Sequence, residues 1–459
     1  MTSAQDARLE EPRTLFTAPW DPIVVRRGDA LGLGALTNVF AEGVAPGLSN
    51  RVTDGRWITV LAWCLDRSHH VFHASGGRSL ESRSDQSKRY RWLRPLELMW
   101  VARTTALAVD TRDRPLPGRR RVEPWYRQYD ENGKAPNRFG MSMDQFRAYR
   151  QTGVYGGYRV AFRKWPGMTV GGDGWTPSST TAALAKWLDG RLGPAHWPPR
   201  ASGDDGVSTQ SAKRGRGEED HWWLRHWPAF DGRGRRVDDT LPRQRTDYSV
   251  LPEADLLRPP IFGRHPSGNR RREVALQIAR SSAVNHAGIC EHLGSHFRHE
   301  PETSLLPAFS RLADAGMDAM GLVAKVLTDK SSVSLEEVAS FPGAVAICNK
   351  LHAASKEWRR RATIDMRHIQ TAHLFAGAIK SGSPGDCLRE LLRHHESHGG
   401  GLRWFVLRKD KVEPRVPPGS NASGYGFRLY SLCRLAAQCG VIRGMPAALR
   451  DADETELDE

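Results

Sequence analysis

Hydrophobic residues near the start of the chain recur at helical spacing. Within residues 29–68, apolar side chains fall three and four positions apart, and such positions share one face of an α-helix. The first apolar stripe is Leu33, Leu36, Val39 and Phe40, and the second is Trp57, Val60, Leu61, Cys64 and Leu65. The pattern predicts two helices separated by a turn at residues 45–47, followed by a third helix over residues 89–109.

Residues 141–198 show a different order of elements. Two short helical segments precede a glycine-rich stretch at residues 168–175 that is typical of a tight β-hairpin, and a longer helix begins near Thr176 and Pro177. Threonine can accept free backbone N–H groups at a helix start, and proline has no N–H to lose at the first helical position. With one inversion, this is the order of a winged helix, which can contact DNA or serve only to dock another protein.

The second half of the chain is predicted to be largely helical. A short helix, a turn and a longer helix after Pro266 are followed by helices near residues 302–327, 335–357 and 363–380. A strand at residues 402–408 indicates a small β-hairpin. The expected fold is therefore mainly α with small β elements, in several domains. They are an N-terminal helical domain (1–140), a winged-helix-like domain (141–198), a basic Gly/Trp-rich linker or loop (199–245), a C-terminal helical domain with the hairpin (246–445) and an acidic tail (446–459).

The charge balance favours a polyanionic partner. Lysine and arginine number 67 against 52 acidic residues, a formal net charge of +15. Phosphate neutralisation and counterion release make nucleic acid, and DNA first of all, the expected partner. The arginine-rich composition is also that of a GC-rich genome, which accounts for part of the excess.

Two groups of cations are the candidate nucleic-acid contacts. The first lies on the two short helices of the winged-helix-like element, and comprises Arg147, Arg150, Arg159, Arg163 and Lys164. The second is the run Arg270, Arg271 and Arg272 in the first turn of a predicted helix. The helix dipole disfavours cations there, so the run indicates either a phosphate-binding patch or simple solvation.

Cysteine spacing and hydropathy indicate in which cellular compartment the protein is located. The six cysteines include no CxxC pair, and no segment approaches 18 consecutive apolar residues. The spacing argues against a zinc ribbon, a redox motif or a disulfide framework, and the hydropathy argues against a transmembrane helix. We expect a cytoplasmic protein with no membrane partner.

Histidines cluster in residues 285–300, which raises the question of a metal. His292, His296 and His299 share one helical stripe, but they make at best a partial site, because structural zinc needs four ligands and catalytic zinc three with a water. No HExxH, P-loop or GxSxG motif is present in the sequence. We therefore predict no metal, no cofactor and no catalytic residues.

Several segments resemble an uncharacterised family of bacterial proteins found in anti-phage defence islands. They are residues 29–65, GVYGGYRVAF at 153–162, GWTPSSTTAALAKWL at 174–188, LLRPPIFGRHPSGNRRREVALQIA at 256–279 and LRELLRHHESHGGGLRWFVL at 388–407. The resemblance implies a subunit of a multi-protein defence system that works beside an ATPase, nuclease or methyltransferase. We expect a non-enzymatic DNA-binding or adaptor subunit. The alternatives are a metal-dependent nuclease component and a purely protein-binding scaffold.

Overall fold

The computed structural model describes residues 29–74, 83–107, 116–119, 122, 153–192, 240–328, 330–399, 403–415 and 426–450. Within these residues the protein is mainly helical and has one small three-stranded antiparallel sheet. The mainly helical fold class predicted from the sequence is thus confirmed. No helix in the described residues is long and apolar enough to cross a bilayer.

Three helices form the N-terminal part, as predicted. They are α1 (Gly34–Val44), α2 (Gly55–Ala74) and α3 (Arg83–Leu107). The two predicted apolar stripes are buried, with only Val39 partly covered. Helix α1 ends at a turn in which Gly47 has φ +69°, a left-handed conformation that glycine adopts without a steric penalty.

Helices α6 (Val154–Lys164) and α7 (Ser179–Leu192) confirm two of the helices predicted for residues 141–198, and both pack on α2. The predicted β-hairpin between them is wrong. Its place is taken by the short 3-10 turn η1 (Val170–Gly172) and a single antiparallel bridge between Thr169 and Pro177. Gly171, Gly172 and Gly174 all have positive φ, so this glycine-rich stretch coils instead of extending into two strands.

Four helices follow from residue 254. They are α10 (Ala254–Phe262), α11 (Pro266–Arg280), α12 (His286–His296) and α13 (Pro301–Val326). The histidine-rich segment forms a helix of its own, because the Asn285 side chain accepts the Gly288 N–H at 2.9 Å and starts a new helix.

Two C-terminal helices differ from their predicted bounds: one is interrupted and the other begins later. The helix predicted over residues 335–357 is divided into α14 (Leu335–Ala339) and α15 (Ala344–Arg361), because Pro342 lacks an N–H and Gly343 has φ +91°. The helix predicted from residue 363 begins later, as α16 (Ile369–Ala378), because His368 before it is left-handed at φ +62°.

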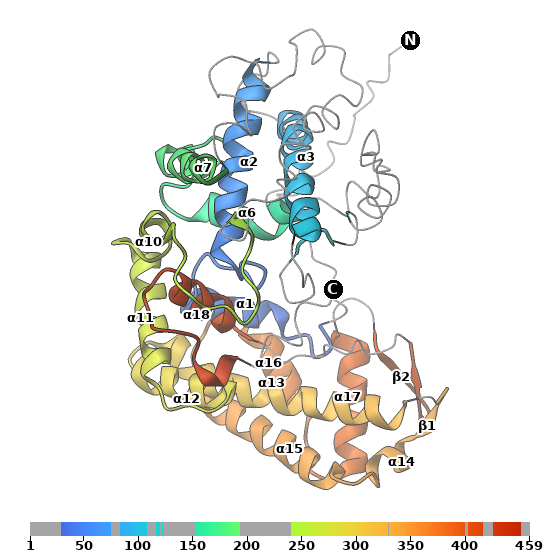
Figure 1. Ribbon diagram of the computed structural model, residues 1–459. Helices are drawn as coiled ribbons and strands as arrows, with labels where there is room; N and C mark the ends of the chain where they lie inside the picture. The colour runs from blue at the N-terminus through green and yellow to red at the C-terminus, as the bar shows by residue number, and fades with distance from the viewer. Residues whose placement is uncertain are drawn as a thin grey trace, which may run out of the picture.

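The predicted C-terminal β-hairpin is confirmed. Strands β2 (Phe405–Arg408) and β3 (Lys411–Pro414) pair antiparallel, with Leu407 opposite Val412. A two-residue strand, β1 (Val333–Ser334), adds to the other side of β3, giving the order β1-β3-β2. The sheet lies beside α17 (Pro384–His398) at one end of the molecule (Figure 1).

Helix α18 (Leu429–Gln438) returns the chain to the N-terminal half. Figure 1 shows α2, α3, α6 and α7 gathered at one end, the helices α13–α17 at the other, and α1, α10, α11 and α18 between them. One hydrophobic cluster includes side chains from all of these helices. Phe40 of α1 stacks on Phe309 of α13 at 4.7 Å between ring centroids, which joins the middle helices to the end formed by α13–α17. The five segments proposed from the sequence stay a prediction.

Buried arginines hold several of these elements in place. Arg56, Arg89, Arg271 and Arg434 are among the largest fully buried side chains of the described residues. Arg89 donates to the carbonyls of Leu65 and Ser68, while Arg56 forms a buried two-point ion pair with Glu253, with N–O distances of 2.6 and 3.0 Å. Part of the cationic excess is therefore internal and cannot act on an outside partner.

Candidate nucleic-acid interface

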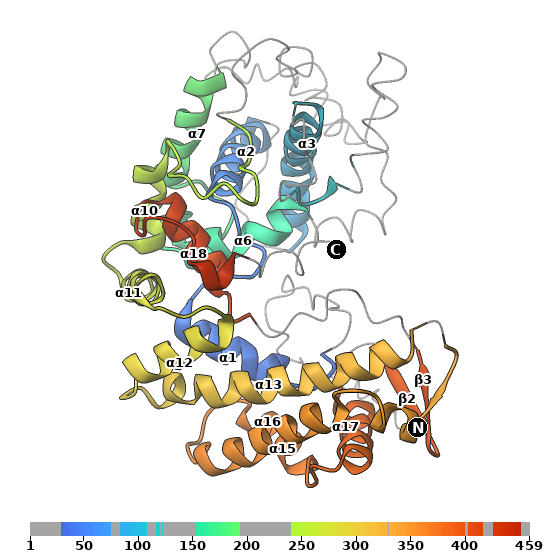
Figure 2. The same cartoon turned by 60° about the horizontal axis from the view of Figure 1, so that its bottom comes forward.

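Helices α10 and α11 form a helix-turn-helix at the outer edge of the molecule (Figures 1 and 2). The two helices pack on each other and are joined by residues 263–265. Gly263 is required in this turn because a Cβ there would lie 2.2 Å from the carbonyl oxygen of Pro259. Three- or four-residue turns containing glycine are the usual connection in DNA-binding helix-turn-helix units.

His265 fixes the start of α11. Its Nδ1 accepts the Gly268 N–H at 3.0 Å, while Nε2 lies 3.2 Å from the Pro260 carbonyl oxygen. Because Nδ1 is an acceptor, the proton of the neutral ring is on Nε2 and is donated to Pro260. Burial and the nearby Arg271 guanidinium hold the pKa of His265 below its ordinary value, which favours this neutral ring.

Arg271 is an internal brace of the turn. Its side chain is fully buried and donates to the carbonyl oxygens of Ile261 at 2.7 Å, Pro260 at 3.3 Å and Pro46. Burial lowers the pKa of Arg271 to about 10, so the guanidinium remains charged at neutral pH. The predicted role of Arg271 as a phosphate contact is corrected here, since no edge of the guanidinium reaches solvent.

Arg270 is also engaged within the protein. It donates to both carboxylate oxygens of Glu300, at 2.9 and 2.7 Å, and to the Gly43 carbonyl oxygen at 2.9 Å. The guanidinium carbon lies 3.9 Å from the centre of the Phe297 ring. These contacts connect α11 to α1 and to the start of α13, so Arg270 positions α11 and has little capacity left for a phosphate.

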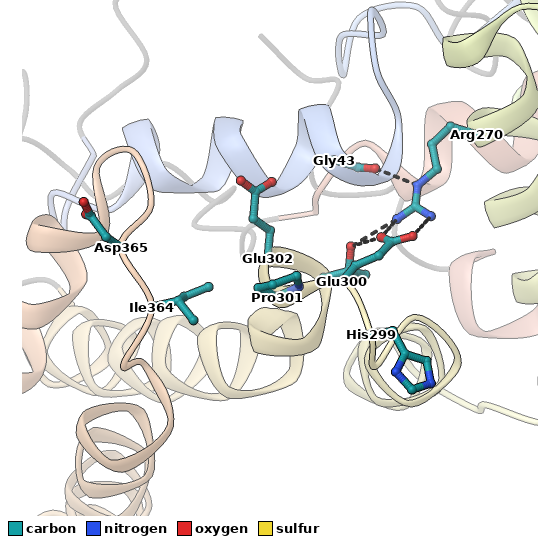
Figure 3. A pocket seen from close by; sticks show the side chains of 9 residues that line it. Gly43, Arg270, His299, Glu300, Pro301, Glu302, Ile364 and Asp365 are labelled. Atoms are coloured by element: carbon teal, nitrogen blue, oxygen red, sulfur yellow. Dashed lines mark hydrogen bonds and ion pairs between the residues drawn. The ribbon is translucent and has the colours of Figure 1, made fainter.

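Arg270 borders an open groove of about 680 Å³ (Figure 3). Glu300, Glu302 and Asp365 also line it. Three carboxylates near one arginine that is already paired disfavour a phosphate group in this groove. We therefore do not assign a nucleotide or nucleic-acid phosphate to it.

The exposed face of α11 carries cations that, unlike Arg270 and Arg271, are not engaged within the protein. Arg272 and Arg280 on the helix and Arg264 in the turn are all exposed, and none of the three side chains has a hydrogen bond or ion pair to another residue that the structure describes. Asn269 lies between them on the same open face. One acidic residue, Glu273, is also there, with its carboxylate 3.9 Å from His296 Nε2. Of the predicted run of three arginines, only Arg272 is available to an outside ligand.

The structure describes three of the five cations in the first predicted group. Arg147 and Arg150 lie outside the described residues. Arg159 is only 8% exposed. Arg163 is exposed, with the carbons of its side chain against Gly174, and Lys164 is exposed with its Nζ 3.5 Å from Glu42 Oε1. Within the described part of α6, Arg163 is thus the cation with the greatest freedom to meet a phosphate.

The three candidate metal histidines do not form a ligand set. His292 and His296 stack with ring centroids 6.4 Å apart, and His299 accepts a hydrogen bond from Arg298 at 3.2 Å. Among the residues that the structure describes, no three His, Cys, Asp or Glu side chains are grouped closely enough to hold a metal ion.

No family model, curated protein or solved structure matches this chain. Arg264, Asn269 and Arg280 were not among the residues predicted from the sequence. The signal that could have found them is the short helix, glycine turn and longer helix in residues 254–280, read together with the helical face on which each polar residue falls.

Proposed function

We propose that this chain is a non-enzymatic DNA-binding or adaptor subunit that holds duplex DNA on the open face of α10 and α11. The observation that carries the proposal is the helix-turn-helix whose outer face presents Arg264, Arg272 and Arg280 without internal partners. The helix before the turn and the braces at Arg270 and Arg271 hold this face in place.

The dimensions of α11 suit the major groove. An α-helix with its side chains is about 10–12 Å across, and the major groove of B-DNA is about 12 Å wide. Arg272 and Arg280 are eight residues apart and therefore separated by about 12 Å along the helix axis. Cations spread over this length can meet several phosphates, and each neutralised phosphate releases counterions and adds to affinity.

The resemblance to defence-island proteins supports a role as one subunit of a multi-protein defence system. In that setting the chain would position DNA for a separate ATPase, nuclease or methyltransferase. All six cysteines are buried and none forms a disulfide, which suits a cytoplasmic location. A winged-helix-like role for residues 141–198 is not proposed, because the described part of that segment, residues 153–192, has no paired wing strands.

The proposal is tested by removing the three exposed arginines together. For the variant Arg264→Ala/Arg272→Ala/Arg280→Ala, we expect weaker binding to duplex DNA of any sequence. The slope of log affinity against log salt should become less steep by about 0.9 per lost phosphate contact, or about 2–3 in all. Fluorescence anisotropy across a salt series measures both quantities.

The matched control removes the same charge elsewhere. Arg360, Arg367 and Arg393 are exposed and make no ion pair within 4.0 Å among the described residues, and they lie on or after α15 and on α17. Their triple alanine variant should keep the wild-type salt slope. Equal effects of the two triple variants would mean that only net charge matters, and the helix-turn-helix assignment would be wrong. Cleavage of DNA that a chelator abolishes would support the nuclease alternative instead.

A further inference from the structure

We propose that α11 reads base sequence, with Asn269 recognising adenine and Arg272 recognising guanine on adjacent base pairs. This inference rests on the proposed function, because it requires α11 to enter the major groove. The proposed function requires α11 only to bind phosphates through its arginines, whereas this inference assigns it contacts to specific bases. Arg264 and Arg280 are assigned to phosphates.

The position of Asn269 and Arg272 along the helix supports base contacts. Both lie in the first half of α11, which is the part of a recognition helix that meets base edges in helix-turn-helix complexes. They are three residues apart, and so about 4.5 Å apart along the axis and about 60° apart around it. Base pairs are spaced by about 3.4 Å, so the two side chains can address neighbouring pairs.

The chemistry of these side chains suits the major groove. An asparagine amide can bond N6 and N7 of adenine together, and an arginine guanidinium can bond O6 and N7 of guanine together. Both side chains are exposed and have no side-chain partner among the described residues. An unengaged planar group can turn to meet a base edge without breaking an internal contact.

Glu273 is the second observation that favours base reading. Its carboxylate lies 3.9 Å from His296 Nε2 of α12, its side chain is 52% exposed, and it follows Arg272 on the exposed part of α11. A carboxylate there would repel phosphates, which weakens non-specific binding. Glutamate can instead accept a hydrogen bond from cytosine N4.

Arg264 and Arg280 flank these readers. Arg264 lies in the turn two residues before α11, and Arg280 is the last residue of α11. The distance from Asn269 to Arg280 is about 16 Å along the axis, which is beyond the width of the groove. Long arginine side chains at the two ends can reach the phosphates on either side.

The experiment is selection from a random-sequence duplex library with the full chain, followed by affinity measurements on the enriched sequence. We expect an enriched motif with adenine and guanine at neighbouring positions, bound about tenfold or more tightly than a variant site with either base changed. Asn269→Ala should remove the preference at adenine, and Arg272→Ala the preference at guanine. Glu273→Gln should increase binding to unselected DNA.

The control variant Arg264→Ala should weaken binding to selected and unselected duplexes by the same factor, and make the salt slope less steep by about 0.9. Salt-dependent binding without an enriched motif would overturn the inference and leave the proposed function standing. An enriched motif that is unchanged in both the Asn269→Ala and Arg272→Ala proteins would also overturn it. Failure of the wild-type chain to bind any duplex would overturn the proposed function as well.

Discussion

A neutral histidine at the turn of the helix-turn-helix determines how α11 begins. The first N–H groups of a helix have no partner within the helix, and a side chain must accept them. His265 does this through Nδ1, and Pro266 at the first helical position has no N–H to satisfy. The same ring donates through Nε2 to Pro260 at the end of α10, so one side chain joins both helices.

Replacement of His265 tests this arrangement. His265→Ala should lower the free energy of unfolding by about 1 kcal/mol, since it removes a capping acceptor. His265→Asn provides a side-chain oxygen for the Gly268 N–H and should retain most of the stability. Urea unfolding at pH 7.5 followed by circular dichroism measures the two variants. An equally large loss in both would mean that the cap contributes little.

The three consecutive arginines show what a sequence can and cannot reveal at the residue scale. Successive residues of a helix are about 100° apart, so three neighbours must face different surroundings. Arg271 faces the core, Arg270 faces α1 and α13, and Arg272 faces outward. The run was predictable as a cationic start of a helix. Its division into two braces and one free cation depends on backbone carbonyls from distant segments, which no local pattern encodes.

At the scale of elements, an ion pair fastens α10 to α2. Arg56 near the start of α2 and Glu253 before α10 have fully buried side chains. Thr59 Oγ1 donates to the same carboxylate at 3.0 Å. Two charges removed from water are costly, and the arrangement is stable only while each has its partner.

Breaking this pair should therefore be more harmful than removing its charge altogether. Arg56→Met leaves the Glu253 carboxylate buried without its cation and should cost about 3–5 kcal/mol of stability. In the double variant Arg56→Met/Glu253→Gln, the amide can still accept from Thr59, and stability should recover in part. Thermal unfolding of the wild type and both variants provides the comparison. A double variant that is less stable than Arg56→Met alone would contradict this account.

Helix positions were largely predictable, because periodic burial determines them. Helices α1, α2, α3 and α13 follow apolar stripes that the sequence displays directly. The errors fall where backbone conformation decides the outcome. Residues 168–175 were predicted as a hairpin because glycine permits tight turns, but three positive-φ glycines there produce a coiled loop. Strand β1 has two residues, too few for any alternation to be visible.

At the scale of the whole molecule, two adjacent histidines of α17 join the segment before α1 to the C-terminal part. His394 Nε2 lies 3.0 Å from the Leu31 carbonyl oxygen, and His395 Nδ1 lies 2.8 Å from that of Ala30. His395 also accepts the Trp404 N–H through Nε2 at 3.0 Å, which requires a neutral ring with its proton on Nδ1. The segment before α1 is thus anchored to both α17 and β2.

Protonation of these histidines should loosen the molecule in acid. Burial lowers the pKa of His394 to about 4, and the neighbouring His398 and His395 lower it further. The hydrogen bond to Leu31 and the nearby Asp29 act in the opposite direction, because they favour the charged ring. Burial likewise lowers the pKa of His395. An unfolded histidine has a pKa of about 6.5, so the unfolded chain binds protons first as pH falls. Stability is therefore full above about pH 6.5 and decreases as pH falls towards about 4.

Protonation of His394 should lower the free energy of unfolding by about 3 kcal/mol, since each pKa unit corresponds to about 1.4 kcal/mol. His394→Gln keeps a donor for the Leu31 carbonyl oxygen but cannot titrate, so its urea midpoint should fall less between pH 7 and pH 4 than that of the wild type. His299→Gln removes one exposed histidine elsewhere in the chain and serves as the control. If all three proteins lose stability in parallel, carboxylate protonation and not the histidine anchor controls the acid response. A smaller loss in His394→Gln alone would show that the neutral ring holds the segment before α1 against the helices that follow α13.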